Sequence, residues 1–311
     1  MTFTDLSFIL LILPSVVLLH TFIKDIKARN ILLVLFSFFY YFYCEPKYAY
    51  ILVGIIILTY FTAKLLETKK NKRILTGYLV ILILLLTYFK YLNFLIRGIN
   101  LLTKGNLLSL SIIMPLGISF YLFQSIAYTS DVYKGKIKAE TAITNLIGFL
   151  TFFPTVMSGP ILRYDNFIQQ WNNREITTDR IANGLRRFIY GLAKKVILAN
   201  QLALIVNYCH SNIPNLGFFL AWAGAICYTL QIYFDFSGYS DMALGISNML
   251  GFTFPENFNF PYMSNTVQEF WRRWHISLSH WFRDYVYIPL GGNRVSTLRW
   301  LLNIIVVWFL T

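Results

Sequence analysis

The sequence predicts an all-α integral membrane protein with several spans, and three observations support this fold class. Of the 311 residues, 57% are hydrophobic and only 13% are charged, a composition that soluble domains of this length do not have. Long uncharged stretches recur, and several approach the roughly 20 residues that cross a bilayer core. Lys and Arg gather in short segments between them, which indicates basic cytoplasmic loops. Despite the net charge of +13, we expect no nucleic-acid partner.

The uncharged stretches mark the expected membrane helices in chain order. The first should be a retained span, because no basic region precedes it and no small-residue cleavage site follows it. Several are shorter than about 20 residues, so those helices must be tilted, flanked by Lys or Arg that reach the interface, or broken inside the protein. Nothing in the composition divides the chain, and we expect one membrane-embedded domain over residues 1–311. The stretches are 6–23, 30–44, 48–63, 74–89, 105–130, 141–162, 196–234 and 242–255, and a last one begins at Trp300.

Basic connections set the expected orientation. Residues 24–29, 64–73 and 134–138 are basic and are separated by two expected spans each. Alternation places all three on one side of the membrane, and the positive-inside rule makes that side the cytoplasm.

The stretch 141–162 does not fit this alternation as a full crossing, because the seven Lys and Arg of residues 163–195 would then lie on the outer face. Its string "FFPTVMSGP" contains Pro154, Gly159 and Pro160, which interrupt helical hydrogen bonding. Irregular backbone persists at membrane depth only when protein or a wet cavity surrounds it. We therefore expect a re-entrant element that enters and leaves on the cytoplasmic side.

The string "EFWRRWHISLSHWFRDYVYIPLGGNR", residues 269–294, concentrates ionisable and aromatic side chains. On one continuous helix over 270–285, the large aromatic residues fall on one face, as expected for an amphipathic helix at the interface. His275 projects at the border of the two faces, and a half-desolvated imidazole is suited to act as a general base. An interfacial anchor with a hydrogen-bonded histidine explains the pattern equally well. The opposite, polar face carries Arg272, Arg273, Ser277, Ser279, His280, Arg283 and Asp284.

Two acids, Asp235 and Asp241, interrupt an apolar region in "YFDFSGYSDMALG", with Ser237 between them. A charge at the bilayer centre costs about 2.5–3.5 kcal/mol on the insertion scale, so these acids need partners, water or a function. Two interpretations stay open: pairing with an arginine of residues 272–294, or a polar tunnel wall.

Other polar residues suggest structural roles. Gln124 lies inside an apolar stretch and is expected to hydrogen-bond a neighbouring helix. Cys44, Cys209 and Cys227 lack disulfide or metal-ligand spacing, so no metal site is expected. Gly-rich phosphate loops and serine-hydrolase elbows are not found in the sequence.

Four long strings together resemble the membrane-bound O-acyltransferase family, in its bacterial branch that O-acetylates alginate and other envelope polysaccharides. The resemblance covers most of the chain from about residue 88 to 311. The strings are "PLGISFYLFQSIAYTSDVYKG", "FFPTVMSGPILRYDNF", "QIYFDFSGYSDMALGISNMLGFTFPENFNFPY" and "EFWRRWHISLSHWFRDYVYIPLGGNR".

This resemblance implies a multi-span helical assembly around a tunnel in the bacterial inner membrane. It implies no bound cofactor, with acetyl-CoA or another acyl thioester as the cytoplasmic donor. The expected partners are membrane lipid, a periplasmic acetyltransferase-type protein and, through it, a polysaccharide acceptor such as an alginate-like exopolysaccharide or peptidoglycan.

The family's chemistry is attributed to two positions, and the resemblance maps the first onto His275. The second is a histidine in a Gly-Leu-Trp-His-Gly string that would follow Thr311, so the resemblance implies a family domain that is incomplete at its C-terminus. Two other classes stay open: an inactive scaffold for a periplasmic acetyltransferase, and a transporter of polar substrates. The tunnel wall or its support is expected to include Gln124, Asp235, Ser237, Asp241, Arg272, Arg273, Arg283 and Asp284.

Overall fold

The computed structural model describes residues 2–103 and 112–310, and every regular element in these ranges is a helix, which confirms the all-α fold class. Part of the expected span 105–130 lies outside the described residues. The chain forms two compact units, each assembled from segments distant in the sequence, and the expected single domain stays a prediction. Unit 1 comprises Met1–Arg29, Ser158–Pro160 and Asn172–Ser279, and unit 2 comprises Asn30–Met157, Ile161–Trp171 and His280–Thr311.

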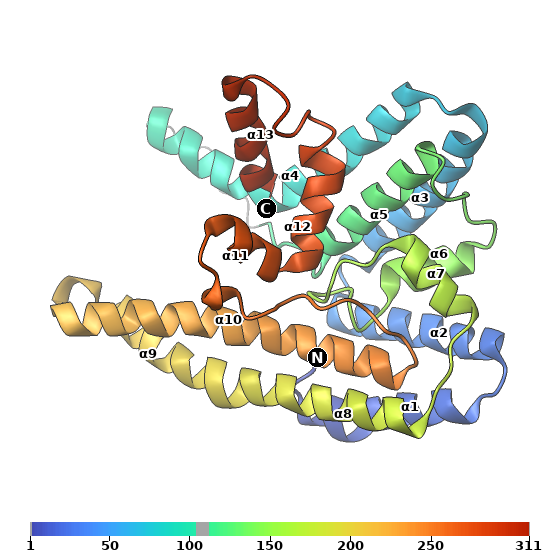
Figure 1. Cartoon of the computed structure of the whole chain (residues 1–311), viewed down its shortest axis with the longest axis horizontal. Coiled ribbons are helices and arrows are strands. Elements are labelled where there is room, and N and C mark those ends of the chain that lie inside the picture. The colour runs from blue at the N-terminus through green and yellow to red at the C-terminus, as the bar shows by residue number, and fades with distance from the viewer. Residues whose placement is uncertain (1, 104–111, 311) are drawn as a thin grey trace. The chain divides into compact units, whose positions relative to one another are not determined.

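Unit 1 contains two long helical segments that lie side by side in opposite directions (Figure 1). In the first segment, α8 (Thr178–Ala193) continues through a π-helical turn (Lys194–Ala199) into α9 (Asn200–Ser211). A short turn then reverses the chain into α10 (Phe218–Met249). The unit also holds the π-helical turn Phe8–Ile12, α1 (Leu13–Phe22), the turn Pro261–Met263, α11 (Val267–Arg273) and the start of α12 (Ile276–Phe282).

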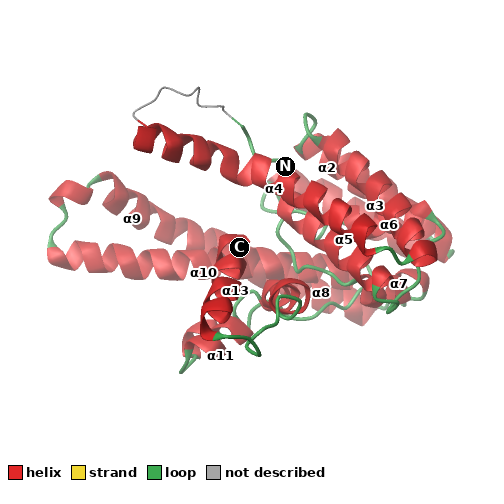
Figure 2. Cartoon of the chain, turned by 90° about the horizontal axis from the view of Figure 1, so that it is seen from above, coloured by secondary structure: helices red, strands yellow, loops and turns green. Residues whose placement is uncertain are grey.

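Unit 2 is a helical bundle in which α3, α4 and α5 pack against one another (Figure 2). The helices are α2 (Ile26–Cys44), α3 (Ala49–Lys69), α4 (Lys72–Thr103), α5 (Ile118–Tyr133), α6 (Ile143–Thr151), α7 (Tyr164–Asn172), the end of α12, the π-helical turn Arg283–Tyr287 and α13 (Thr297–Leu310).

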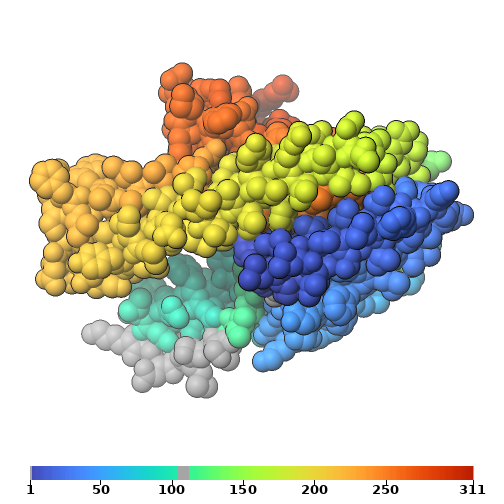
Figure 3. Space-filling view, turned by 90° about the horizontal axis from the view of Figure 1, so that it is seen from below, coloured from blue at the N-terminus to red at the C-terminus, as the bar shows by residue number. Residues whose placement is uncertain are grey.

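Several helices have the length and composition of membrane spans. Among the described residues, three helices are long and apolar enough to cross a bilayer: Ala49–Lys69, Lys72–Thr103 and the continuous Thr178–Ser211. Figure 3 shows α9, in yellow, beside the start of α10, in orange, at one end of unit 1. Phe218 and Phe219 on α10 are 71% and 85% exposed there, as expected for side chains that face lipid.

The helix boundaries around the acidic string differ from those expected. Asp235 and Asp241 lie inside α10, which continues from the uncharged stretch 196–234 through the acids into the stretch 242–255. The chain instead reverses within the expected span 196–234, near Ile213–Asn215. The basic residues before position 196, expected in a connection, are also helical. Ion pairs between α10 and the preceding helix, described below, explain why the acids do not end it.

Two pairs of glycines hold α8 and α10 at close range. A Cβ placed on Gly184 would lie 2.6 Å from the carbonyl oxygen of Gly245, and one on Gly191 would lie 2.5 Å from that of Gly238. The two glycines of each helix are seven residues apart, which is about two turns, so both face the same neighbour. Small residues allow such close backbone approach in membrane bundles.

The expected break after residue 151 is present in unit 2, where α6 ends and the chain runs through buried irregular backbone from Phe152 to Val156. The Phe153 N–H donates to Ser37 Oγ at 3.2 Å. Gly117, with φ +69°, lies so close that a Cβ would be 2.2 Å from the Val156 carbonyl oxygen. Protein therefore surrounds this backbone, as the prediction required, while its re-entrant placement in a membrane stays a prediction.

Candidate functional site

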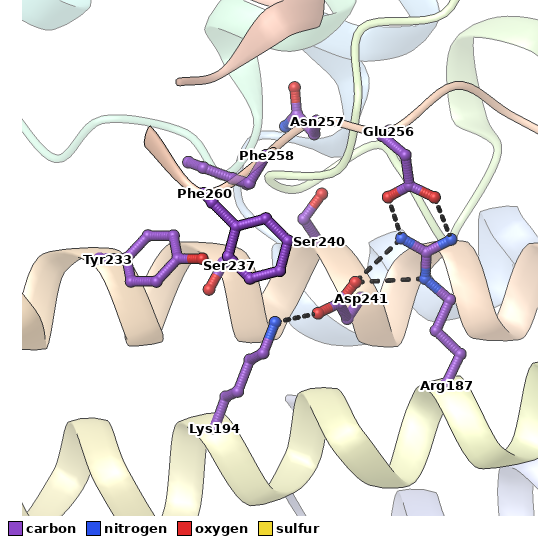
Figure 4. A pocket seen from close by; sticks show the side chains of 10 residues that line it. All are labelled: Arg187, Lys194, Tyr233, Ser237, Ser240, Asp241, Glu256, Asn257, Phe258 and Phe260. Carbon is purple, nitrogen blue, oxygen red and sulfur yellow. Dashed lines mark hydrogen bonds and ion pairs between the residues drawn. The ribbon is translucent and has the colours of Figure 1, made fainter. Parts of the chain in front are cut away.

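A polar pocket of about 80 Å³ lies in unit 1 between α8, α10 and the loop that follows α10 (Figure 4). Such a volume exceeds the roughly 10–15 Å³ that one water requires, so the pocket can hold a small organic group. The polar lining consists of Arg187, Lys194, Ser237, Ser240, Asp241, Glu256 and Asn257, and the aromatic lining consists of Tyr233, Phe258 and Phe260.

The pocket's charged groups form one ion-pair network. Asp241 accepts from Arg187 Nη2 at 2.9 Å and from Lys194 Nζ at 2.6 Å. Arg187 Nη1 also donates to Glu256 Oε1 at 2.7 Å. Two cations thus face two carboxylates, and the network carries no net charge.

The expected partners of the two acids were wrong. Both acids of α10 pair with the preceding helix instead of with an arginine of residues 272–294, since Lys195 binds Asp235 in the same way that Lys194 binds Asp241. The close glycine contacts bring these side chains within reach. The alternative interpretation, a polar wall, describes Asp241 and Ser237, both of which line the pocket.

Three buried polar atoms of the lining have no hydrogen-bond partner among the described residues: Ser237 Oγ, Ser240 Oγ and Asn257 Nδ2. The three residues are 2%, 2% and 1% exposed. Buried polar groups are rarely left unsatisfied, so each such group needs an explanation.

His275 lies at a sharp bend between α11 and α12, so the prediction of one helix over 270–285 was wrong. Its φ is +42°, a conformation that few residues other than glycine adopt. Two backbone hydrogen bonds to the 257–259 loop hold the bend: Ile276 N donates to Asn257 O, and Asn259 N donates to Arg273 O, each at 2.9 Å. Strained conformations of this kind cluster at functional sites.

The amide of Asn257 fixes the protonation of His275. Its Oδ1 accepts from the Ser277 N–H at 3.2 Å, and because a backbone N–H only donates, this atom must be the oxygen. His275 Nδ1 lies 3.1 Å from the same oxygen. Nδ1 must therefore carry the proton, which makes Nε2 the basic nitrogen.

The environment of His275 is apolar, and the prediction of a half-exposed ring was wrong, because the residue is only 5% exposed. Phe236 contacts it edge to face with ring centroids 4.6 Å apart, and Phe258 stacks at 6.3 Å. Burial lowers the pKa of His275 to about 3, so the imidazole is neutral at physiological pH. His275 does not line the pocket, and Asn257 connects the two.

The other predicted residues are not part of the pocket lining. Arg272 and Arg273 are on α11, where Arg273 pairs with Glu269 at 2.8 Å. In unit 2, Asp284 pairs with Arg283 at 2.7 Å and with Arg163. Burial alone would raise the pKa of Asp284, but hydrogen bonds from both arginines outweigh it and lower the pKa.

Gln124, also in unit 2, does not make the expected contact with a neighbouring helix through its carbonyl. It is 1% exposed, and its Oε1 has no hydrogen-bond partner among the described residues. No group of three metal-ligating side chains was found in the described part of the chain.

Sequence reasoning predicted only Ser237 and Asp241 of the pocket lining. It missed the other polar groups, including Arg187, Lys194, Glu256 and Asn257. Arg187 and Lys194 are seven residues apart, as are Gly184 and Gly191, and this shared helical spacing was a usable signal. Asn257 belongs to the string "FPENFNFPY", but nothing local distinguishes its amide from that of Asn259.

The model of the membrane-bound O-acyltransferase family matches residues 138–310, more than half of the chain. The chain belongs to this family. The matched range contains the whole pocket, including Asn257, and also His275.

Curated relatives give the same family context. The chain is 40% identical over its full length to the probable alginate O-acetylase AlgI of Azotobacter vinelandii, covering 64% of that protein. It is 38% identical over 94% of its length to the peptidoglycan O-acetyltransferase of Helicobacter pylori, covering 62% of it. A teichoic acid D-alanyltransferase of Bacillus subtilis is 36% identical over 57% of the chain. The chain spans less than two thirds of the length of these relatives.

Proposed function

We propose that this chain is a membrane-bound O-acyltransferase of the bacterial envelope that passes acetyl groups from a cytoplasmic thioester toward a polysaccharide. The observation that carries the proposal is the full-length similarity to proteins named as alginate O-acetylases. The neutral polar pocket beside a buried, neutral histidine supports acyl transfer, which needs an unprotonated base and donors for a carbonyl oxygen.

The proposed donor is acetyl-CoA or another acyl thioester, and the acceptor is an alginate-like exopolysaccharide or peptidoglycan, reached through a periplasmic acetyltransferase-type partner. The proposed location is the inner membrane, crossed several times. The apolar spans and the family's membrane character support this location.

His275 is the proposed base. An acceptor hydroxyl attacks the thioester carbonyl carbon while its proton passes to Nε2 of the imidazole. The carbon–sulfur bond then breaks, and the proton moves from His275 to the departing thiolate. The products are an O-acyl ester and a free thiol, and the histidine returns to its neutral form.

His275→Asn tests this role, because asparagine tolerates the left-handed backbone conformation at this bend and removes the imidazole. The host bacterium would carry the variant in place of the wild-type gene, and ester-linked acetate would be measured in purified exopolysaccharide and peptidoglycan. Loss of a general base lowers transfer by about 10²- to 10⁴-fold. His280→Asn is the matched control, since it makes the same substitution five residues further along the chain, on α12 and outside the bend that His275 occupies.

The outcomes separate the competing functions. Unchanged acetate after gene deletion contradicts the acetyltransferase proposal. Loss on deletion with normal acetate in His275→Asn supports an inactive scaffold for a periplasmic acetyltransferase. The transporter alternative has lost its main motivation, because Asp235 and Asp241 are both paired with lysine.

A further inference from the structure

Two basic segments meet at one end of the helical bundle in unit 2. Residues 64–73 include the turn between α3 and α4, and residues 131–140 include the loop that follows α5. Together they contain eight Lys and Arg and three acids, which gives a net charge of +5. We call the eight cations, all of them exposed, the basic patch: Lys64, Lys69, Lys70, Lys72, Arg73, Lys134, Lys136 and Lys138.

Defined contacts hold the two segments together. The Ala139 N–H donates to Glu67 Oε1 at 3.2 Å. Lys70 Nζ reaches the second segment, where it lies 3.9 Å from the position that a Cβ on Gly135 would occupy. The cations of both segments are therefore parts of one surface.

The acids of the two segments are engaged mainly in hydrogen bonds within the protein. Glu67 and Glu140 accept from backbone N–H groups, and Asp131 accepts from the Tyr285 hydroxyl. Among the described residues, the one ion pair that includes a member of the basic patch joins Lys136 to Asp131 at 3.3 Å. The patch thus keeps an excess of positive charge that an anion from outside the protein can neutralise.

Three of the cations occupy positions that their own helices disfavour. Lys70 follows the end of α3 with φ +40°, the left-handed conformation that glycine usually supplies there. Lys72 and Arg73 lie in the first turn of α4, which contains no acid, although the N-terminal end of a helix favours negative charge. A bound anion would offset the cost of placing these three cations at the turn.

An apolar stripe on α3 leads to the basic patch. Ile57, Phe61 and Leu65 are 44%, 59% and 45% exposed, and their spacing of four residues puts them on one face of the helix. Lys69 is the next residue in this row. Both α3 and α4 are long and apolar enough to cross a bilayer, so the turn between them is expected at the depth of the lipid phosphates.

We propose that the basic patch binds the phosphate of an anionic phospholipid, with an acyl chain of this lipid along the stripe of Ile57, Phe61 and Leu65. Clusters of about four to eight Lys and Arg beside a membrane span recognise anionic headgroups in this way. A soluble anion would use the cations and gain nothing from the stripe. The inference goes beyond the proposed acyl transfer and does not depend on it.

Basic loops also orient membrane proteins during insertion, and that role by itself makes a different prediction. Orientation depends on how many cations flank the spans, whereas a lipid site depends on these cations at this turn. Three cations of unit 1 provide a matched set for comparison, because they are equally exposed: Lys24, Lys27 and Arg186.

Lipid binding by the purified protein in an uncharged detergent tests the site. Dissociation constants for a short-chain phosphatidylglycerol and a short-chain phosphatidylcholine would be measured by native mass spectrometry, and far-UV circular dichroism would verify the fold of each variant. One cation beside an anionic headgroup contributes about five-fold to affinity. Lys70→Gly keeps the left-handed turn and should weaken phosphatidylglycerol by about five-fold. The triple variant Lys69→Gln, Lys70→Gly, Lys72→Gln should weaken it by about 100-fold and leave phosphatidylcholine unchanged.

The control variant Lys24→Gln, Lys27→Gln, Arg186→Gln should bind phosphatidylglycerol as the wild type does. Equal affinity of the wild type for the two lipids overturns the proposal, and so does equal weakening in the control and the patch triple variant. Inorganic phosphate and CoA, each added to the wild type at the concentration of phosphatidylglycerol, should not displace this lipid, because neither has a chain for the stripe. Displacement by either would assign the basic patch to a soluble anion and overturn the lipid site.

Discussion

Gly191 is the position where the contact between α8 and α10 can be tested most directly. Alanine there would place its Cβ 2.5 Å from the Gly238 carbonyl oxygen and 2.7 Å from the Met242 nitrogen. Both are backbone atoms that cannot rotate away, and ordinary contact begins at 3.4 Å. The helices would have to separate by about 0.9 Å, the difference between 3.4 and 2.5 Å.

Overpacking of this kind lowers the unfolding free energy by about 1–3 kcal/mol, and replacing glycine by alanine inside a helix raises it by about 1 kcal/mol. Gly77→Ala on α4 shows the helix-propensity gain without overpacking, because a Cβ at Gly77 meets nothing within 4 Å. Since the helix-propensity gain is common to both variants, Gly191→Ala should be less stable than Gly77→Ala by about 1–3 kcal/mol.

The comparison would be made by denaturant unfolding of each purified variant in the same detergent, followed by far-UV circular dichroism. Equal stabilities would refute the inference that the backbones of α8 and α10 touch at this level. A lower stability in Gly191→Ala together with weakened Arg187–Asp241 pairing would support it further.

Three more predictions concern charge. Between pH 7 and pH 5, the unfolding free energy of the wild type should fall by about 2 kcal/mol more than that of His275→Asn. The pKa of His275 is lowered to about 3 in the folded chain, so between pH 6.5 and that value only the unfolded chain binds a proton at this imidazole. Equal pH dependence of the two proteins would contradict the burial of His275. Asn257→Asp should raise the pKa of His275, because it places a carboxylate against Nδ1. As the pH is lowered, acetyl transfer by this variant should therefore begin to decline at a higher pH than in the wild type. An unchanged pH profile of acetyl transfer would count against the contact between Asn257 and His275. Asp241→Asn should lower the unfolding free energy of the protein by about 1–3 kcal/mol, since Lys194 loses its partner. Asp235→Asn, at a carboxylate 45% exposed, should lower it by less than about 1 kcal/mol in the same unfolding assay. The reverse order of the two effects would be inconsistent with the ion-pair network.

Composition was sufficient to predict the fold class. Local chemistry was sufficient to predict the break near Pro154, because proline and glycine alter the backbone at their own positions. It was not sufficient at Asp241. The acids inside an apolar run were expected to pair with an arginine of residues 272–294 or to form a polar tunnel wall. The pairing of Asp241 with Lys194 depends on the packing of two helical segments, which the local sequence does not contain.

The candidate site was predicted in part for the same reason. His275 stood out by residue type, but its bend and burial depend on Asn257, which is 18 residues earlier in the chain. An argument from helical periodicity assumes a regular backbone and cannot predict a contact between residues so far apart in the chain. Ser237 was singled out by its position between two acids, whereas Ser240 and Asn257 became distinguishable only through their unsatisfied atoms.

The salt-bridged helices of unit 1 also constrain how the protein is made. The first segment carries Arg187, Lys194 and Lys195, and α10 carries Asp235 and Asp241. Alone in lipid, each charge near the centre would cost about 2.5–3.5 kcal/mol on the insertion scale, and the opposite charges that offset this cost come from the other segment. The ribosome completes α8 and α9 before α10, so the cations of the first segment find their acidic partners only once α10 has been made.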